Sequence, residues 1–185
     1  MRKGLRFLLL FLMCSFVANV WAAAEEPVRK VLFQMNDHGS KYWRIPALVT
    51  ANDGSLVAVV DKRGNALGDL PNKISIMAVR STDNGVTWSN PVEVAAANDY
   101  GATYGDPAVV LDEKSGELVC MFVGDKGLWD STPWARQNLY VSKSSDNGQT
   151  WTSPKRITDQ VYNDHTDWYA GLQAQAMDSV LKTAA

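Results

Sequence analysis

The sequence predicts an all-β, antiparallel fold, and three observations support this prediction. Short apolar segments rich in β-branched residues alternate with turn sequences, no segment sustains the helical apolar period of about 3.6 residues, and one eight-residue motif recurs 63 residues later. The 185 residues are 46% hydrophobic and 21% charged, with 13 Gly and 7 Pro, which excludes collagen-like, disordered and multi-span membrane classes. Length and composition therefore indicate one globular domain, or part of one.

Residues 1–22 have the three-part layout of a secretory signal. Basic residues within the first six positions precede an apolar run at 7–17, and Val20-Trp21-Ala22 forms a small-x-small ending. The run is shorter than the roughly 20 residues that span a bilayer, which disfavours a transmembrane anchor. A lipoprotein signal ending at Cys14 is a second alternative, but the bulky residue before that Cys fits lipid attachment poorly. We therefore expect an exported protein that is periplasmic, cell-surface or secreted.

Removal of residues 1–22 leaves 15 basic and 20 acidic residues, a net charge of −5, and one cysteine, Cys120. This mildly acidic balance gives no electrostatic reason to expect nucleic acid or an anionic membrane surface as a partner. A single cysteine cannot form an intrachain disulfide. We expect packing to stabilise the chain, with no nucleic-acid partner and no membrane span after signal cleavage.

Five short segments are predicted as β-strands because each is apolar, rich in β-forming residues and bounded by turn signals. They lie at 56–60, 74–79, 108–111, 118–123 and 139–141. Four turn sequences with residues that tolerate a positive φ separate or flank them. These turns are Asn52-Asp53-Gly54, Asp83-Asn84-Gly85, Lys114-Ser115-Gly116 and Asp146-Asn147-Gly148.

Internal repetition predicts the architecture more closely. The octapeptide at 81–88, STDNGVTW, recurs at 144–151 as SSDNGQTW, with six identities. The flanks match at nearly the same offset, since Gly54-Ser55-Leu56-Val57 resembles Gly116-Glu117-Leu118-Val119. Each unit then consists of a strand, a turn, a strand, a long connection, a strand, a hairpin and a strand, which is typical of a β-propeller blade.

The chemistry of the octapeptide indicates a structural turn. Ser and Asp oxygens accept backbone N–H groups, Asn-Gly closes the hairpin, and the final Trp packs over it. The positions assigned to these turns are Ser81, Asp83, Gly85, Trp88, Ser144, Asp146, Gly148 and Trp151. A calcium loop is the alternative, but Asp-x-Asp-x-Asp-Gly with a Glu at the twelfth position does not occur. We expect no metal ion and no cofactor.

The octapeptide is an Asp box, or BNR repeat, and further motifs accompany it. Trp43-Arg44-Ile45-Pro46 precedes the first box, and the other segments are Asp61-Lys62-Arg63, Asp69-Leu70-Pro71-Asn72 and Gly105-Asp106-Pro107. In this order they resemble the bacterial exo-α-sialidases, or neuraminidases, over roughly residues 41–151. The resemblance implies a six-bladed β-propeller of the sialidase type, of which this chain holds about two to three N-terminal blades.

The resemblance also implies a retaining glycoside hydrolase that releases terminal sialic acid from sialylated glycans on proteins, lipids or oligosaccharides. Asp69 matches the family's acid/base residue, which protonates the leaving glycoside oxygen; a solvated Asp in a turn is the alternative. Arg44 matches the first of three arginines that bind the sugar carboxylate, a role for which a guanidinium fork is well suited. The alternative for Arg44 is a surface position before a strand.

Four further pocket residues follow from the resemblance. Arg63 and Asp106 match positions near the 4-hydroxyl and the amide side of the sugar, with a structural ion pair as the alternative. Trp129 and Trp134 match the aromatic groups around the N-acetyl methyl, with packing in the core or at the rim as the alternative.

The chain ends before the positions of the family's Tyr nucleophile, its Glu partner and the other two arginines. Residues 164–172 still resemble the start of a blade, whereas 173–185 form an Ala-rich tail without a β pattern. The predicted organisation is a signal peptide at 1–22, a partial propeller at 23–172 and a divergent tail at 173–185. We hypothesise a truncated or frameshifted sialidase with little or no turnover of its own. The alternatives are a non-catalytic Asp-box module that binds carbohydrate or protein, and an inactive remnant with exposed strand edges.

Overall fold

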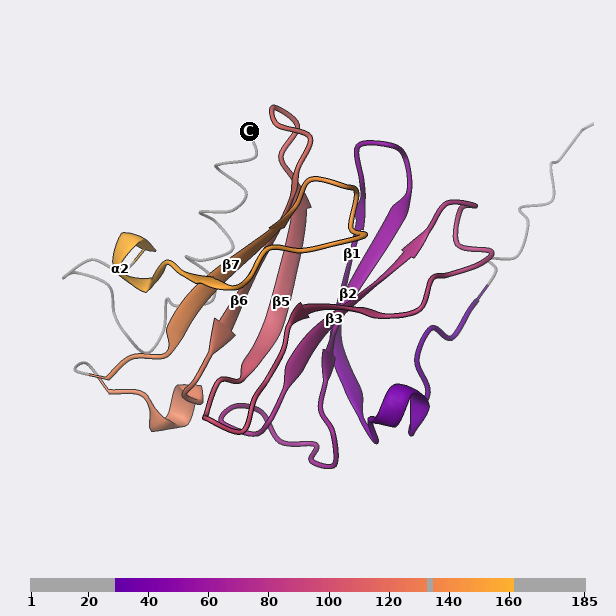
Figure 1. Cartoon of the computed structure of the whole chain (residues 1–185). Coiled ribbons are helices and arrows are strands. Elements are labelled where there is room, and N and C mark those ends of the chain that lie inside the picture. The colour runs from indigo at the N-terminus through magenta and orange to yellow at the C-terminus, as the bar shows by residue number, and fades with distance from the viewer. Residues whose placement is uncertain (1–28, 133–134, 162–185) are drawn as a thin grey trace, which may run out of the picture. The chain divides into compact units, whose positions relative to one another are not determined.

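The computed structural model describes residues 29–132 and 135–161 (Figure 1). The chain divides into two units, residues 1–31 and 32–185, and every strand among the described residues belongs to the second unit. The predicted signal peptide at 1–22 and the divergent tail at 173–185 lie outside the described residues.

The described part of the second unit contains two four-stranded antiparallel sheets, each with its strands in sequence order. The first sheet consists of β1 (Trp43–Thr50), β2 (Leu56–Lys62), β3 (Ser75–Ser81) and β4 (Val92–Ala95). The second sheet consists of β5 (Tyr104–Leu111), β6 (Leu118–Gly124), β7 (Asn138–Ser144) and β8 (Lys155–Arg156). Three short helical turns accompany them: η1 (Asp37–Gly39), η2 (Leu128–Asp130) and α2 (Thr158–Val161).

The five predicted strands are confirmed as β2, β3, β5, β6 and β7, and the four predicted turns contain the expected positive-φ residues. Three strands carry weaker sequence signals. β1 contains Pro46, and Pro cannot donate to a ladder, so it suits an edge strand such as this one. β4 and β8 have four and two residues, and both residues of β8 are exposed.

The two sheets repeat one another in register as well as in sequence. Leu56 pairs with Ser81 in the first sheet, and Leu118 pairs with Ser144 in the second. Both first strands also carry a β-bulge at the same place, between Arg44 and Ala47 in β1 and between Gly105 and Ala108 in β5. A bulge re-aims the side chains beside it, and both of these bulges lie next to the pocket described below.

The main core lies between the two sheets. Alternate residues of β2 and β3 face alternate residues of β5 and β6, because successive side chains of a strand point to opposite faces. The buried members of this core are Ala51, Val57, Val59, Ile76, Ala78, Val94, Ala95, Val109, Leu118, Cys120 and Phe122. β5 contacts β1, β2 and β3, so the first strand of the second sheet lies against the first sheet (Figure 1).

The two Asp boxes close the β3–β4 and β7–β8 connections with matching hydrogen bonds. The Ser81 hydroxyl accepts the Gly85 N–H at 2.8 Å, and Asp83 accepts the Thr87 N–H at 2.8 Å. In the second box the corresponding distances are 2.8 Å and 2.9 Å. Hydrogen bonds from the Thr87 side chain and backbone lower the pKa of Asp83 to about 2, so this carboxylate stays ionised as the turn's acceptor.

Gly148 is expected to tolerate substitution less well than its equivalent, Gly85. Both have a left-handed φ, 87° and 86°, so replacing either by Ala costs about 1–2 kcal/mol. A Cβ on Gly148 would also lie 2.8 Å from Cγ2 of the fully buried Val57, whereas the nearest atom to a Cβ on Gly85 is 3.7 Å away. Gly148→Ala should therefore cost about 1–3 kcal/mol more than Gly85→Ala, because the rigid Val57 must move.

Urea denaturation followed by tryptophan fluorescence measures both free energies of unfolding. Gly85→Ala is the matched control, since it imposes the same backbone conformation without the collision. Equal losses in the two variants would show that the second box does not pack against β2 as described.

Candidate functional site

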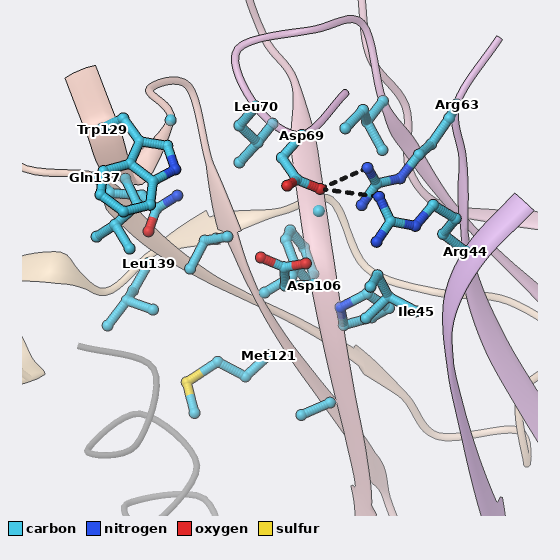
Figure 2. A pocket seen from close by; sticks show the side chains of 18 residues that line it. Arg44, Ile45, Arg63, Asp69, Leu70, Asp106, Met121, Trp129, Gln137 and Leu139 are labelled. Carbon is cyan, nitrogen blue, oxygen red and sulfur yellow. Dashed lines mark hydrogen bonds and ion pairs between the residues drawn. The ribbon is translucent and has the colours of Figure 1, made fainter. Parts of the chain in front are cut away.

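A pocket of about 690 Å³ lies where β1 and β5 begin and β2 and β6 end (Figure 2). Its charged lining residues are Arg44, Arg63, Asp69 and Asp106. Its apolar lining includes Ile45, Leu70, Ile74, Met121, Val123, Leu128, Trp129 and Leu139. The pocket therefore joins a charged end to an apolar wall, as sites for small polar ligands commonly do.

The two bulges deliver equivalent positions to this pocket. Ile45 and Asp106 have φ values of 54° and 55°, and each precedes a proline. This left-handed conformation is rare for a non-glycine residue and especially rare for a β-branched one. Both residues line the pocket, so the strained backbone coincides with the candidate site.

Arg63 is the buried centre of the charged end, with 1% of its side chain exposed. Its Nε and Nη2 donate to Oδ2 of Asp61 at 3.2 and 2.7 Å. Its Nη1 donates to Oδ1 of Asp69 at 2.6 Å and to the carbonyls of Leu67 and Gly68 at 3.0 Å each. The guanidinium thus holds the connection between β2 and β3 that carries Asp69.

Asp69 projects from that connection with 68% of its side chain exposed. Its Oδ1 lies 3.6 Å from Nη1 of Arg44, and Figure 2 shows this contact beside the one to Arg63. Asn72 fixes the backbone of Asp69 by donating its side-chain N–H to the Asp69 carbonyl at 2.7 Å. Thr103 in turn donates its hydroxyl to the Asn72 carbonyl. The carboxylate is exposed while its backbone is anchored.

Arg44 at the start of β1 is the accessible guanidinium of the pocket. Its side chain is 44% exposed, and its Nη1 donates to the Leu67 carbonyl at 3.3 Å. Because Arg presents five N–H donors, most of its donor capacity remains for a ligand. A planar fork of this kind binds carboxylates in bidentate fashion.

Burial also shapes the electrostatics of the charged end. It raises the pKa of Asp61 to about 7, although the hydrogen bonds from Arg63 act in the opposite direction. For Arg63, burial acts to lower the pKa, but the hydrogen bonds to Asp69 and Asp61 outweigh it and raise that pKa. Arg63 therefore remains a cation beside two carboxyl groups.

The described residues contain neither a metal-binding group of side chains nor a membrane-spanning helix. Within 29–132 and 135–161, no three His, Cys, Asp or Glu side chains are grouped so as to hold a metal ion. In the same part of the chain, no helix has the length and apolar character needed to cross a membrane.

Known proteins share both the sequence and the fold that surround this pocket. The family model of the BNR repeat-like domain matches residues 71–169. A sialidase of Bacteroides fragilis is 34% identical over 153 residues, which cover 74% of this chain and 28% of that protein. The solved structure of the Hadza microbial sialidase Hz136 is 34% identical, with a TM-score of 0.64 over 70% of this chain and 28% of its own.

The chain belongs to the sialidase family with BNR repeats. The fold agrees with that of the NanB sialidase from Streptococcus pneumoniae, with a TM-score of 0.62 at 16% identity. The predicted all-β propeller fold is confirmed, and each four-stranded sheet is one blade of a sialidase propeller. The chain spans 28% and 42% of the length of the Bacteroides fragilis and Paraclostridium sordellii sialidases that it matches.

The structure brings five of the six residues matched to the sialidase pocket to one place. Arg44, Arg63, Asp69, Asp106 and Trp129 all line the pocket. Trp129 lies on η2 with 81% of its surface exposed, which places it at the rim and outside the core. Arg63 forms its ion pairs with Asp61 and Asp69. The remaining residue, Trp134, lies outside the described residues.

The sequence analysis assigned no role to Asp61 or, apart from Trp129, to the apolar wall. Asp61 is fully buried, yet it contacts both Arg63 and the backbone of Asp106. Its sequence signal was a carboxylate at the end of the apolar strand 56–60, two residues before an Arg. Met121 and Leu139 belong to predicted strands, and strand alternation places them on the face opposite Phe122, where they form a second cluster with Leu70.

Proposed function

We propose that this chain forms the N-terminal blades of an exo-α-sialidase that releases terminal sialic acid from sialylated glycans with retention of configuration. The observation that carries the proposal is the half-exposed guanidinium of Arg44 beside the exposed carboxyl of Asp69, next to an apolar wall. Sialic acid is a carboxylated sugar with an N-acetyl group, so it calls for a guanidinium and an apolar surface in one pocket.

In this proposal, Arg44 binds the carboxylate of the sugar through paired N–H donors. Asp69 delivers a proton to the leaving glycoside oxygen and later accepts one from the attacking water. Arg63 and Asn72 orient Asp69, while Asp106 and the apolar wall contact the far side of the sugar. By resemblance, the Tyr nucleophile, its Glu and the two other arginines belong to later blades, which complete the site.

We also propose that the protein is exported, with residues 1–22 as a cleaved signal. The support for this is the arrangement of basic, apolar and small residues in that segment. The sialylated glycans of an extracellular or periplasmic environment would then be its substrates.

The roles of Asp69 and Arg44 are testable in a complete propeller. The region shared with the Bacteroides fragilis sialidase is exchanged for the sequence of this chain, and hydrolysis of a fluorogenic sialoside is measured. Asp69→Asn is expected to lower kcat/KM by about 10²–10⁴-fold, the usual contribution of a general acid–base group. Arg44→Ala is expected to lower kcat/KM by about 10–100-fold, the loss of a charged hydrogen bond worth about 1.5–3 kcal/mol.

Arg80→Ala is the matched control, because Arg80 lies in β3 and pairs with Asp53 away from the pocket. Its kcat/KM should change little. Full turnover by the Asp69→Asn chimaera would contradict the acid/base role. If a folded chimaera bound sialic acid but did not turn over the sialoside, a carbohydrate-binding module would be the better description. The isolated chain is expected to show little or no turnover.

A further inference from the structure

Asp61 occupies the junction between the two sheets at the base of the pocket. It is the penultimate residue of β2, with no exposed side-chain surface. Its Oδ2 accepts two N–H groups of Arg63, and its Oδ1 accepts the backbone N–H of Asp106 in β5 at 3.1 Å. One carboxylate thus binds the Arg63 side chain, just after the end of β2, and the backbone of β5 in the second sheet.

The bond to Asp106 acts on a backbone that needs support. Asp106 lies in the β5 bulge with a φ of 55°, a conformation that persists in non-glycine residues only where the surroundings fix it. The hydrogen bond from its N–H to a fully buried acceptor supplies such a constraint. Through this bond Asp61 determines the direction in which the Asp106 side chain enters the pocket.

The bonds to Arg63 act on Asp69. Two sides of the guanidinium are used, because Nε and Nη2 face Asp61 while Nη1 faces Asp69 and its neighbours. The guanidinium is planar and rigid, so fixing one edge fixes the other. Asp61 therefore acts on Asp69 through the Arg63 side chain, and on Asp106 through a hydrogen bond to the Asp106 backbone N–H.

We propose that Asp61 is a positioning residue that aligns the two pocket carboxyl groups, Asp69 in the β2–β3 connection and Asp106 in β5. It makes no contact with the ligand and acts through Arg63 and the Asp106 peptide. The proposal rests on the proposed function only in taking a sialic acid as the ligand whose binding depends on this alignment.

The charged groups around Asp61 make its ionisation state important. Arg63 faces it from the end of β2, Arg44 is its cross-strand partner in β1, Asp106 faces it from β5, and Asp69 lies beyond Arg63. β3 presents the apolar Ile76 as its partner. Burial raises the pKa of Asp61, and protonation would turn an acceptor oxygen into a donor that opposes the N–H groups of Arg63.

The test compares Asp61→Asn with Asp53→Asn in the full chain by ¹H–¹⁵N NMR. Asp53 is the matched control, because it pairs with Arg80 in the same sheet but away from the pocket. In Asp61→Asn the Asp106 amide proton should move upfield by several tenths of a ppm, since a neutral acceptor polarises the N–H less than a carboxylate. The Arg63 Nε–H signal should lose its protection from exchange. Unchanged Asp106 and Arg63 signals in folded Asp61→Asn would overturn the proposal.

Two further measurements separate this proposal from the proposed function and from misfolding. If Asp61→Asn does not fold, a pH titration of the wild-type chain tests the positioning role of Asp61 instead. The Asp106 amide and Arg63 Nε–H signals should then shift together as Asp61 titrates, and separate midpoints would contradict the alignment. Titration with N-acetylneuraminic acid uses the complete-propeller chimaera, because the isolated chain holds only part of the proposed site. It should give a Kd about tenfold weaker for Asp61→Asn than for Asp53→Asn, a loss of about 1.4 kcal/mol. Absence of binding by the chimaera without either substitution would count against the function, while the Asp106 signal still decides the role of Asp61.

Discussion

Replacing Arg63 with Met is expected to destabilise the folded chain by about 3–5 kcal/mol near neutral pH. The substitution keeps most of the side-chain volume but leaves the Asp61 carboxyl buried without its cation. Asp61 and Arg63 have 0% and 1% of their side chains exposed, so water cannot replace the lost partner. The change also removes the 2.6 Å contact to Asp69. Urea denaturation at two pH values gives both the size of the effect and its electrostatic origin.

The pH dependence of this variant has a definite sign. In the folded chain burial raises the pKa of Asp61 from an ordinary value of 3.8 to about 7. A carboxyl group whose pKa is higher in the folded chain than in the unfolded chain contributes its full stabilisation below the unfolded pKa. This contribution to the free energy of unfolding is lost as the pH rises through the folded pKa. Arg63 acts to lower the pKa of Asp61, so removing Arg63 raises this pKa further and the loss of stability continues to higher pH. The penalty of Arg63→Met should be larger at about pH 8 than at about pH 5.

The double variant Asp61→Leu, Arg63→Met serves as the control. Replacing both members of a buried ion pair by apolar residues is often neutral, whereas removing one leaves an unpaired charge. The double variant should therefore recover most of the lost stability. A single variant as stable as the wild type, or a penalty independent of pH, would contradict the buried pair described here.

Phe122→Ala is expected to cost about 3–5 kcal/mol, the usual loss for a large aromatic side chain in a core. Phe122 is 1% exposed and packs between the two sheets, with its ring edge-on to Tyr104 at 5.5 Å and parallel to Tyr140 at 6.2 Å. It is a member of the main core, so its removal leaves a cavity between the two sheets.

Phe122→Leu is the matched control, because it retains an apolar side chain in the same β-strand. Its loss should be clearly smaller, since the cavity that remains is smaller. Thermal and urea unfolding, followed by near-ultraviolet circular dichroism of the aromatic cluster, measure both variants. Similar small losses for Ala and Leu would indicate that the two sheets are not packed through this residue.

The sequence was sufficient to predict the strands that are apolar on both faces. β2, β3 and β6 are buried almost throughout, so their composition alone distinguishes them. β8 gave no such signal, because its two residues are polar and exposed and pair only with β7. Its pairing satisfies backbone groups, and backbone hydrogen bonding leaves no mark in the side-chain pattern.

The candidate site also contains residues that could be predicted from the sequence and one that could not. Arg44 and Asp69 could be predicted because each lies in a local motif that resembles the sialidases. Asp61 could not, because its second partner, Asp106, is 45 residues away in the sequence and is reached through its backbone. Only the packing of β5 against the first sheet brings these residues together, and the sequence pattern of the strands does not reveal such packing.

The bulges in β1 and β5 have the same backbone conformation but carry side chains of different chemistry. Ile45 and Asp106 share one conformation and one place in the repeat, yet one is aliphatic and the other is a carboxylic acid. The two blades thus present side chains of different chemistry from the same backbone conformation, and both line the pocket. A repeated scaffold of this kind can acquire a new ligand by altering one residue per blade, and its evolution can change specificity without redesigning the fold.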